Sequence, residues 1–127
     1  MRRISTGSVQ EKRLGFSQAV VGGGMVFVSA MAATGRDGAI IGKDSVYRQA
    51  QTILDNIKQV LIEAGSSLDY VVQTRIYLAN IARSEEVGRA HQEAFAGNTP
   101  ALSLVHVKPF HNPDILLEIE AVALAGG

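Results

Sequence analysis

The last third of the chain narrows most sharply what the whole can fold into, because two strand-like runs follow each other there across one short loop. The first run covers residues 98–107 and the second covers residues 115–124. Alternate side chains of a strand point to opposite faces, so Glu118 and Glu120 share one face of an otherwise apolar strand. Two neighbouring carboxylates need solvent, a cation or another subunit to face. We therefore expect the functional groups on that face of the sheet.

The first half of the chain predicts a β-hairpin and a long helix. Residues 14–21 and 25–30 are typical of strands, and the three glycines between them can supply the positive φ of a tight turn. Further along, apolar residues recur at helical spacing from Asp44 or Ser45 onward. Gly65 then stands where a helix C-terminus favours glycine, so we expect one helix up to that point.

The second half predicts a third strand and a shorter helix before the final pair of strands. The side chains of residues 70–78 are expected to alternate between the two faces of a strand. Val72 falls on one face, and Val71 falls on the other face together with Arg75. Ser84 is the expected N-cap of the second helix. The predicted order is β-β-α-β-α-β-β. One mixed sheet with both helices on a single face satisfies this order, in a sandwich of the α+β class.

That arrangement leaves the other face of the sheet without helices. The residues expected there combine large apolar groups with opposite charges: Phe27, Val71, Arg75, Tyr77, Leu102, Leu104, Glu118 and Glu120. A mixed face of this kind is a poor solvent surface and is typical of an interface. We expect a homo-oligomer whose sheets face inward, and we expect Arg75 to pair with Glu118 or Glu120.

Composition restricts the classes of partner. The 127 residues predict one domain, 1–127, with residues 1–13 as a loosely held lead-in. Twelve basic and twelve acidic residues give zero net charge, which disfavours binding to nucleic acid or to a membrane surface. The absence of cysteine and of metal-ligand spacing among the histidines predicts no metal and no cofactor. Without an apolar leader or a membrane-spanning run, we expect a cytoplasmic protein.

Several segments together resemble the reactive intermediate deaminase family, also called the RidA or YjgF family. The matching segments are Gly15-Phe-Ser-Gln-Ala-Val20, Met25-Val-Phe-Val-Ser29, Gln51-Thr-Ile-Leu-Asp-Asn-Ile57, Ala64-Gly-Ser-Ser-Leu68, Val71-Val72, Thr99-Pro-Ala101 with Ser103, and Glu118-Ile-Glu-Ala121. The resemblance implies a chorismate-mutase-like fold and a homotrimer whose sheets form a central barrel. It also implies clefts between adjacent subunits, in which enamines or imines derived from amino acids are hydrolysed to keto acids and ammonia.

The family's pattern also implies site residues, and this chain departs from it at several of them. Leu102 stands where the family has a substrate-binding arginine, and Phe16 stands where it has a tyrosine. The family's pattern has a serine followed by a glycine in the second strand; here the serine is kept as Ser29, and Ala30 stands in place of the glycine. The carboxylate of the family's pattern is also kept, as Glu118. Leucine cannot make the bidentate charged contact of an arginine, so the resemblance predicts a deaminase of non-standard specificity rather than an ordinary 2-imino-acid deaminase.

Glu118 is the candidate catalytic residue, because imine hydrolysis needs a water molecule polarised by a carboxylate. The candidate substrate-binding residues are Phe16, Ser29, Ala30, Leu102, Leu104 and His106. His106 shares the parity of Leu102 and Leu104, and its imidazole could act as an acid or base near neutral pH. Two alternatives stay open: a trimer that binds a small apolar molecule without turnover, and a ribonuclease or translation inhibitor, which zero net charge disfavours.

Overall fold

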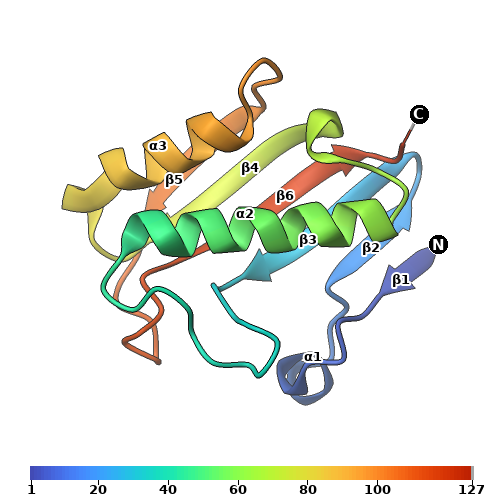
Figure 1. Cartoon of the computed structure of the whole chain (residues 1–127). Helices are drawn as coiled ribbons and strands as arrows, with labels where there is room; N and C mark the ends of the chain where they lie inside the picture. The colour runs from blue at the N-terminus through green and yellow to red at the C-terminus, as the bar shows by residue number, and fades with distance from the viewer. Residues whose placement is uncertain (127) are drawn as a thin grey trace.

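The computed structural model describes residues 1–126 as one six-stranded sheet with its two longer helices on one face (Figure 1). The strands are β1 (Arg2–Ile4), β2 (Ala19–Gly22), β3 (Met25–Met31), β4 (Val71–Leu78), β5 (Ala101–His106) and β6 (Leu117–Leu124). The helices are α1 (Val9–Leu14), α2 (Val46–Glu63) and α3 (Ser84–Ala94), with short 3-10 turns at Leu68–Tyr70 and Ile81–Arg83. The predicted α+β architecture is confirmed.

The sheet is mixed, with its strands in the order β1-β2-β3-β6-β4-β5. β4 and β5 run parallel, and the other neighbouring pairs are antiparallel. The connection from β4 to β5 passes through α3, as a parallel pair requires a crossover. β6 lies between β3 and β4 in the middle of the sheet. Leu117 and Ile119 of β6 are buried against the helices, so the alternating residues Glu118 and Glu120 lie on the uncovered face.

Helix α2 is defined by its caps and by its apolar side. The Ser45 side chain accepts a hydrogen bond from the Arg48 backbone N–H (3.1 Å), as an N-cap does. At the other end Gly65 has a φ of 80°, and the Ser66 N–H donates to the Leu61 carbonyl (2.7 Å). Only glycine adopts this left-handed conformation without strain. Both predicted ends of the helix are confirmed.

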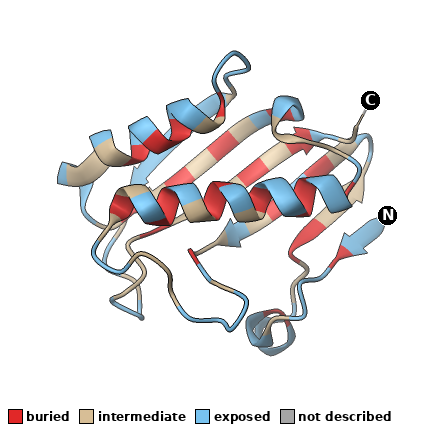
Figure 2. Cartoon of the chain, in the orientation of Figure 1, coloured by how far each residue is buried: buried red, intermediate tan, exposed pale blue. Residues whose placement is uncertain are grey.

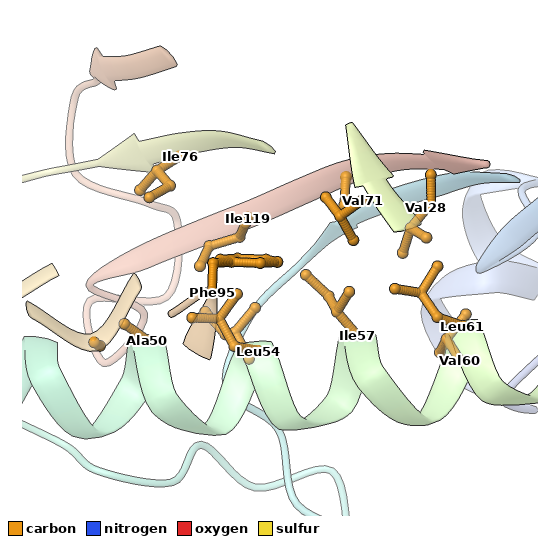
Figure 3. Packing of buried hydrophobic residues seen from close by; sticks show 14 of the residues in the cluster. Val28, Ala50, Leu54, Ile57, Val60, Leu61, Val71, Ile76, Phe95 and Ile119 are labelled. Carbon is orange, nitrogen blue, oxygen red and sulfur yellow. The ribbon is translucent and has the colours of Figure 1, made fainter. Parts of the chain in front are cut away.

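The hydrophobic core lies between α2, α3 and the covered face of the sheet. Leu54, Ile57 and Leu61 of α2 point toward the strands, where they meet residues such as Val28 and Ile119 (Figure 3). Buried and partly buried positions alternate along β4 and β6, and buried positions recur along one side of α2 and α3 (Figure 2). Each large apolar side chain buried in this layer contributes about 1.5–3 kcal/mol, so this packing holds the helices on the sheet.

The loosely held lead-in predicted for residues 1–13 is wrong. β1 pairs with β2 at the sheet edge, and Ser8 and Glu11 form a capping box that starts α1. Two orphan N-terminal donors are satisfied reciprocally in such a box, which stabilises even one turn of helix. The strand predicted over residues 14–21 accordingly begins only at Ala19, because Leu14 ends α1.

The predicted alternation in β4 is wrong at its first residues. The pairing of β4 with β6 shifts register between Val71 and Gln73, so one extra residue is accommodated there. Such a shift reverses the phase of the side chains. Val71 is therefore buried and Val72 is exposed, the opposite of the prediction. Ser84 is also not the N-cap of α3, because the helix begins at Ser84 and Arg83 occupies the cap position.

Leu102 and Leu104 were expected on the uncovered face, and the register of β5 corrects this. Leu102 pairs with Thr74 and Leu104 pairs with Ile76, both of which are buried beneath the helices. Paired residues of neighbouring strands point to the same face of a sheet. The two leucines thus lie on the helix side, and they are 47% and 39% exposed because β5 is an edge strand. Phe27 is 50% exposed in β3, as expected of the uncovered face.

Candidate functional site

An open cavity of about 390 Å³ lies where three central strands meet the connection between β5 and β6. Its lining combines Ala30 of β3, Tyr77 of β4, Glu118 of β6 and residues 107–110 of the connection. These segments are far apart in the sequence, and the sheet brings their ends together. The cavity therefore exists only in the completed fold.

Strand pairing positions each of these groups. Tyr77 lies directly opposite Glu118 in the antiparallel pairing of β4 with β6. In β3 the register shifts between Val28 and Met31, and Ala30 lies within this irregular stretch next to β6. The Val107 N–H donates to the Leu78 carbonyl (3.0 Å), which extends the parallel pairing into the start of the connection.

Gln49 fixes the far end of the same connection from inside the core. This side chain is fully buried in α2, although its chemistry is polar. Its amide nitrogen donates to the carbonyls of Asp114 (2.7 Å) and Gly42 (3.3 Å), and its amide oxygen accepts from the Leu116 N–H (3.0 Å). A buried amide is stable only with such partners. Gln49 thus anchors the backbone immediately before Glu118.

The two carboxylates of β6 have different environments. Glu120 pairs with Arg75, whose Nη1 lies 3.3 Å from Glu120 Oε1, and the Tyr77 hydroxyl donates to the same oxygen. The hydrogen bond to Glu120 raises the pKa of Tyr77. The prediction that Arg75 pairs with one of the two acids is confirmed, and the acid is Glu120. The polar groups of Arg75 and Tyr77 on the uncovered face are therefore both bound to Glu120.

Glu118 is half-buried and lines the cavity, and it has no ion pair with any of the described residues. Burial raises its pKa above the ordinary value of a glutamate, because the charged form loses hydration. A carboxyl group with a raised pKa exchanges protons more readily near neutral pH than an exposed one does. Of the two acids, Glu118 is the one that lines the cavity and has no ion pair among the described residues.

The remaining predicted site residues do not line the cavity within one chain. Ser29 Oγ donates to the Ser17 carbonyl (2.8 Å), so this hydroxyl joins two segments of backbone. Phe16 is partly buried just after α1 and does not line the cavity. His106 lies on β5 and pairs with Leu78, so it shares the helix side with Leu102 and Leu104. Within one chain, Ala30 and Glu118 are the predicted residues that the cavity brings together.

Sequence reasoning missed residues 107–110 as part of the cavity. Lys108, Pro109 and Phe110 place a cation, a rigid residue and an aromatic ring directly after a strand. That combination ahead of the acid-bearing strand was a usable signal. Whether these residues line a cavity depends on the path of the connection, and the sequence pattern does not define that path.

Other titratable groups lie outside the cavity. His91 is buried: its Nε2 is 2.8 Å from Thr74 Oγ1, and the centroid of its ring lies 4.7 Å from that of Phe95. Burial lowers the pKa of His91, which favours the neutral ring. Among residues 1–126 no group of three potential metal ligands comes together. No helix in that part of the chain has the length and apolar character needed to cross a membrane.

Residues 10–125 match the family model described as Endoribonuclease L-PSP. A solved structure from Mycobacterium tuberculosis, Rv2704, is described as a member of the YjgF/YER057c/UK114 family. It is 36% identical to this chain with a TM-score of 0.87, over 97% of this chain and 98% of that one. The chain belongs to the YjgF/YER057c/UK114 family.

Relatives in this family come from distant organisms. An uncharacterised protein of Streptomyces coelicolor is 31% identical over 126 residues, which is 99% of this chain and 93% of that protein. The mitochondrial protein mmf1 of Schizosaccharomyces pombe is 32% identical over 111 residues, covering 86% of this chain and 67% of that protein. The YjgF/YER057c/UK114 fold is therefore shared along nearly the whole chain, and the resemblance found in the sequence is confirmed.

Proposed function

We propose that this protein is a homotrimer whose inter-subunit clefts hydrolyse a small reactive enamine or imine, with a specificity different from that of ordinary 2-imino-acid deaminases. The observation that carries the proposal is Glu118. It is a half-buried carboxylate without an ionic partner among the described residues, and it lines a cavity beside a second acid that is already paired. Because Glu120 is neutralised by Arg75, Glu118 is the carboxyl group left to exchange a proton with a molecule in the cavity.

The reaction follows from this arrangement. Glu118 accepts a proton from a water molecule as the water oxygen adds to the carbon of a protonated C=N bond, giving a carbinolamine. The same carboxyl group then returns the proton to the nitrogen. The C–N bond breaks, ammonia leaves with the bonding pair, and the hydroxyl gives its proton to the Glu118 carboxylate to form the ketone. That proton then passes to ammonia or solvent, which restores the carboxylate. An enamine enters the same sequence after protonation at carbon gives its imine.

The arrangement of β5 supports a cleft that is formed by two copies. Leu102 and Glu118 lie on opposite faces of the same sheet, so one chain cannot bring both to one ligand. An adjacent copy could present its β5 edge, with Leu102, Leu104 and His106, to the Glu118 cavity. Exposed apolar groups such as Phe27 on the uncovered face favour the burial of that face between copies. Three copies would close the sheets around a common axis.

A non-catalytic trimer is the second candidate, and Leu102 is the observation that favours it. An apolar residue in place of the family's arginine would suit a small apolar ligand held without turnover. A ribonuclease or translation inhibitor has less support, since the zero net charge offers no field that attracts RNA. We place the protein in the cytoplasm, as its sequence led us to expect.

The test is ammonia release from freshly generated imines and enamines, measured for the unaltered protein and for Glu118→Gln. We expect turnover to fall by at least about a hundredfold, as the loss of a general base does. Glu85→Gln, an exposed acid of α3, is the matched control and should keep full activity. Equal activity in the Glu118 variant would refute the catalytic role, and ligand-dependent thermal stabilisation without any product would favour the binding protein. Light scattering should give the mass of three chains.

A further inference from the structure

Lys108 places a positive charge in the cavity that the proposed reaction has not used. Lys108 is among the residues that line the same cavity as Glu118 and Tyr77. In residues 1–126 the ion pairs are Lys43 with Asp114, Arg75 with Glu120, and Arg83 with Glu86. Neither Lys108 nor Glu118 is among them. The cavity therefore presents a free cation and a free carboxylate to whatever enters it.

The backbone holds Lys108 in place even though its side chain is exposed. The preceding residue, Val107, is bonded to β4 through the Leu78 carbonyl at 3.0 Å. The following residue, Pro109, has a fixed φ and restricts Lys108 to extended conformations. The far end of the connection is anchored to the core by Gln49. Lys108 thus extends from a backbone that is tied at both sides of the cavity.

The rest of the lining is largely apolar. Ala30, Val107, Pro109 and Phe110 supply methyl groups, a proline ring and an aromatic ring, with no further charge. A ligand that satisfies all of these groups carries an anionic end for Lys108 and a polar carbon–nitrogen or carbon–oxygen bond for Glu118. It also carries a short apolar group for the walls. A cavity of about 390 Å³ suits a molecule of this size.

We propose that Lys108 binds the carboxylate of a small keto or imino acid in this cavity, in place of the arginine that ordinary 2-imino-acid deaminases use, and so gives the site a specificity different from theirs. The site is the one of the proposed function, on which this inference rests. Leu102 cannot supply the anchor, from this chain or from an adjacent copy, because a leucine side chain carries no charge. Lysine binds an anion as a point charge rather than through the planar fork of an arginine. The anchor therefore tolerates variation in how the carboxylate is oriented.

The experiment is an NMR titration with 2-oxobutanoate and with its neutral amide, 2-oxobutanamide. We expect Lys108→Gln to weaken binding of the acid about tenfold, as loss of one charged hydrogen bond does, and to leave binding of the amide unchanged. Lys108→Arg keeps the charge and should retain most of the affinity for the acid. Lys12→Gln, an exposed lysine of α1 remote from the cavity lining, is the control for net charge and should bind both ligands like the unaltered protein.

Three results would overturn the anchor: no binding of the acid at millimolar concentration, equal losses for acid and amide, or the same loss in Lys12→Gln. Turnover separates this inference from the proposed function. If Glu118→Gln keeps full ammonia release while Lys108→Gln loses binding of the acid, the anchor stands and the proposed function fails. If Glu118→Gln loses turnover while Lys108→Gln binds the acid normally, the proposed function stands and the anchor fails.

Discussion

The tether from Gln49 to the β5–β6 connection gives the sharpest test of how this fold supports its cavity. Gln49→Met removes three hydrogen bonds while keeping a side chain of similar size that suits a helix. The two shorter bonds hold the Asp114 carbonyl and the Leu116 N–H. Leaving partly buried backbone groups unpaired costs about 1–3 kcal/mol each. We expect the free energy of unfolding to fall by about 3 kcal/mol.

The measurement is thermal and denaturant unfolding at one protein concentration, because association shifts apparent stability. A loss of this size corresponds to roughly 10 °C in the unfolding midpoint. Gln59→Met is the matched control, with the same substitution on the exposed side of the same helix, and should change the midpoint little. The Gln49 variant should also lose ligand binding in the cavity before it unfolds. Equal midpoints for the two variants would refute the tether.

Two further predictions concern the acids. Burial would raise the pKa of Glu11, but hydrogen bonds from Thr6 and Ser8 outweigh it and lower the pKa to about 2 from an ordinary 4.5. Glu11 thus stabilises the fold above pH 4.5, and Glu11→Gln should cost up to about 3 kcal/mol near neutral pH. In unfolding experiments that difference should shrink between pH 4.5 and 2, and a difference independent of pH would contradict it. The effect of Glu118 on stability is opposite to that of Glu11. Because its pKa is raised in the folded state, Glu118 destabilises the fold once the pH exceeds the ordinary pKa of a glutamate. Glu118→Gln should therefore unfold at a higher temperature than the unaltered protein at neutral pH, and this gain should vanish in acid. An unchanged or lower midpoint at neutral pH would count against the burial of this carboxyl group.

The parts of the fold that depend on local periodicity could be predicted from the sequence. Ser45 and Gly65 mark the ends of α2 because capping is a local property, and the spacing of Glu118 and Glu120 requires a shared face in any strand. Helix α1 was missed because its apolar residues Val9 and Leu14 are exposed, so it carries no buried stripe. The capping box of Ser8 and Glu11 was its remaining signal.

The rest could not be predicted because it depends on how strands pair. The register shift at Val71–Gln73 and the parallel pairing of β5 are set by the partner strand, and they decide which side Val72 and Leu102 occupy. The cavity depends in addition on the path of residues 107–110. A carboxylate in an apolar strand makes Glu118 a candidate from the sequence alone, whereas the place of Lys108 in the cavity depends on the path of the connection.

The central place of β6 has a consequence for how the molecule is made. β6 is the sixth strand along the chain, yet it joins β3 to β4, so neither half of the sheet can close on the other until this strand arrives. During synthesis the ribosome must extend the chain through residues 117–124 before β3 and β4 acquire their shared neighbour. Until then the facing edges of β3 and β4 keep unpaired backbone N–H and C=O groups, which makes a partly synthesised chain prone to aggregation.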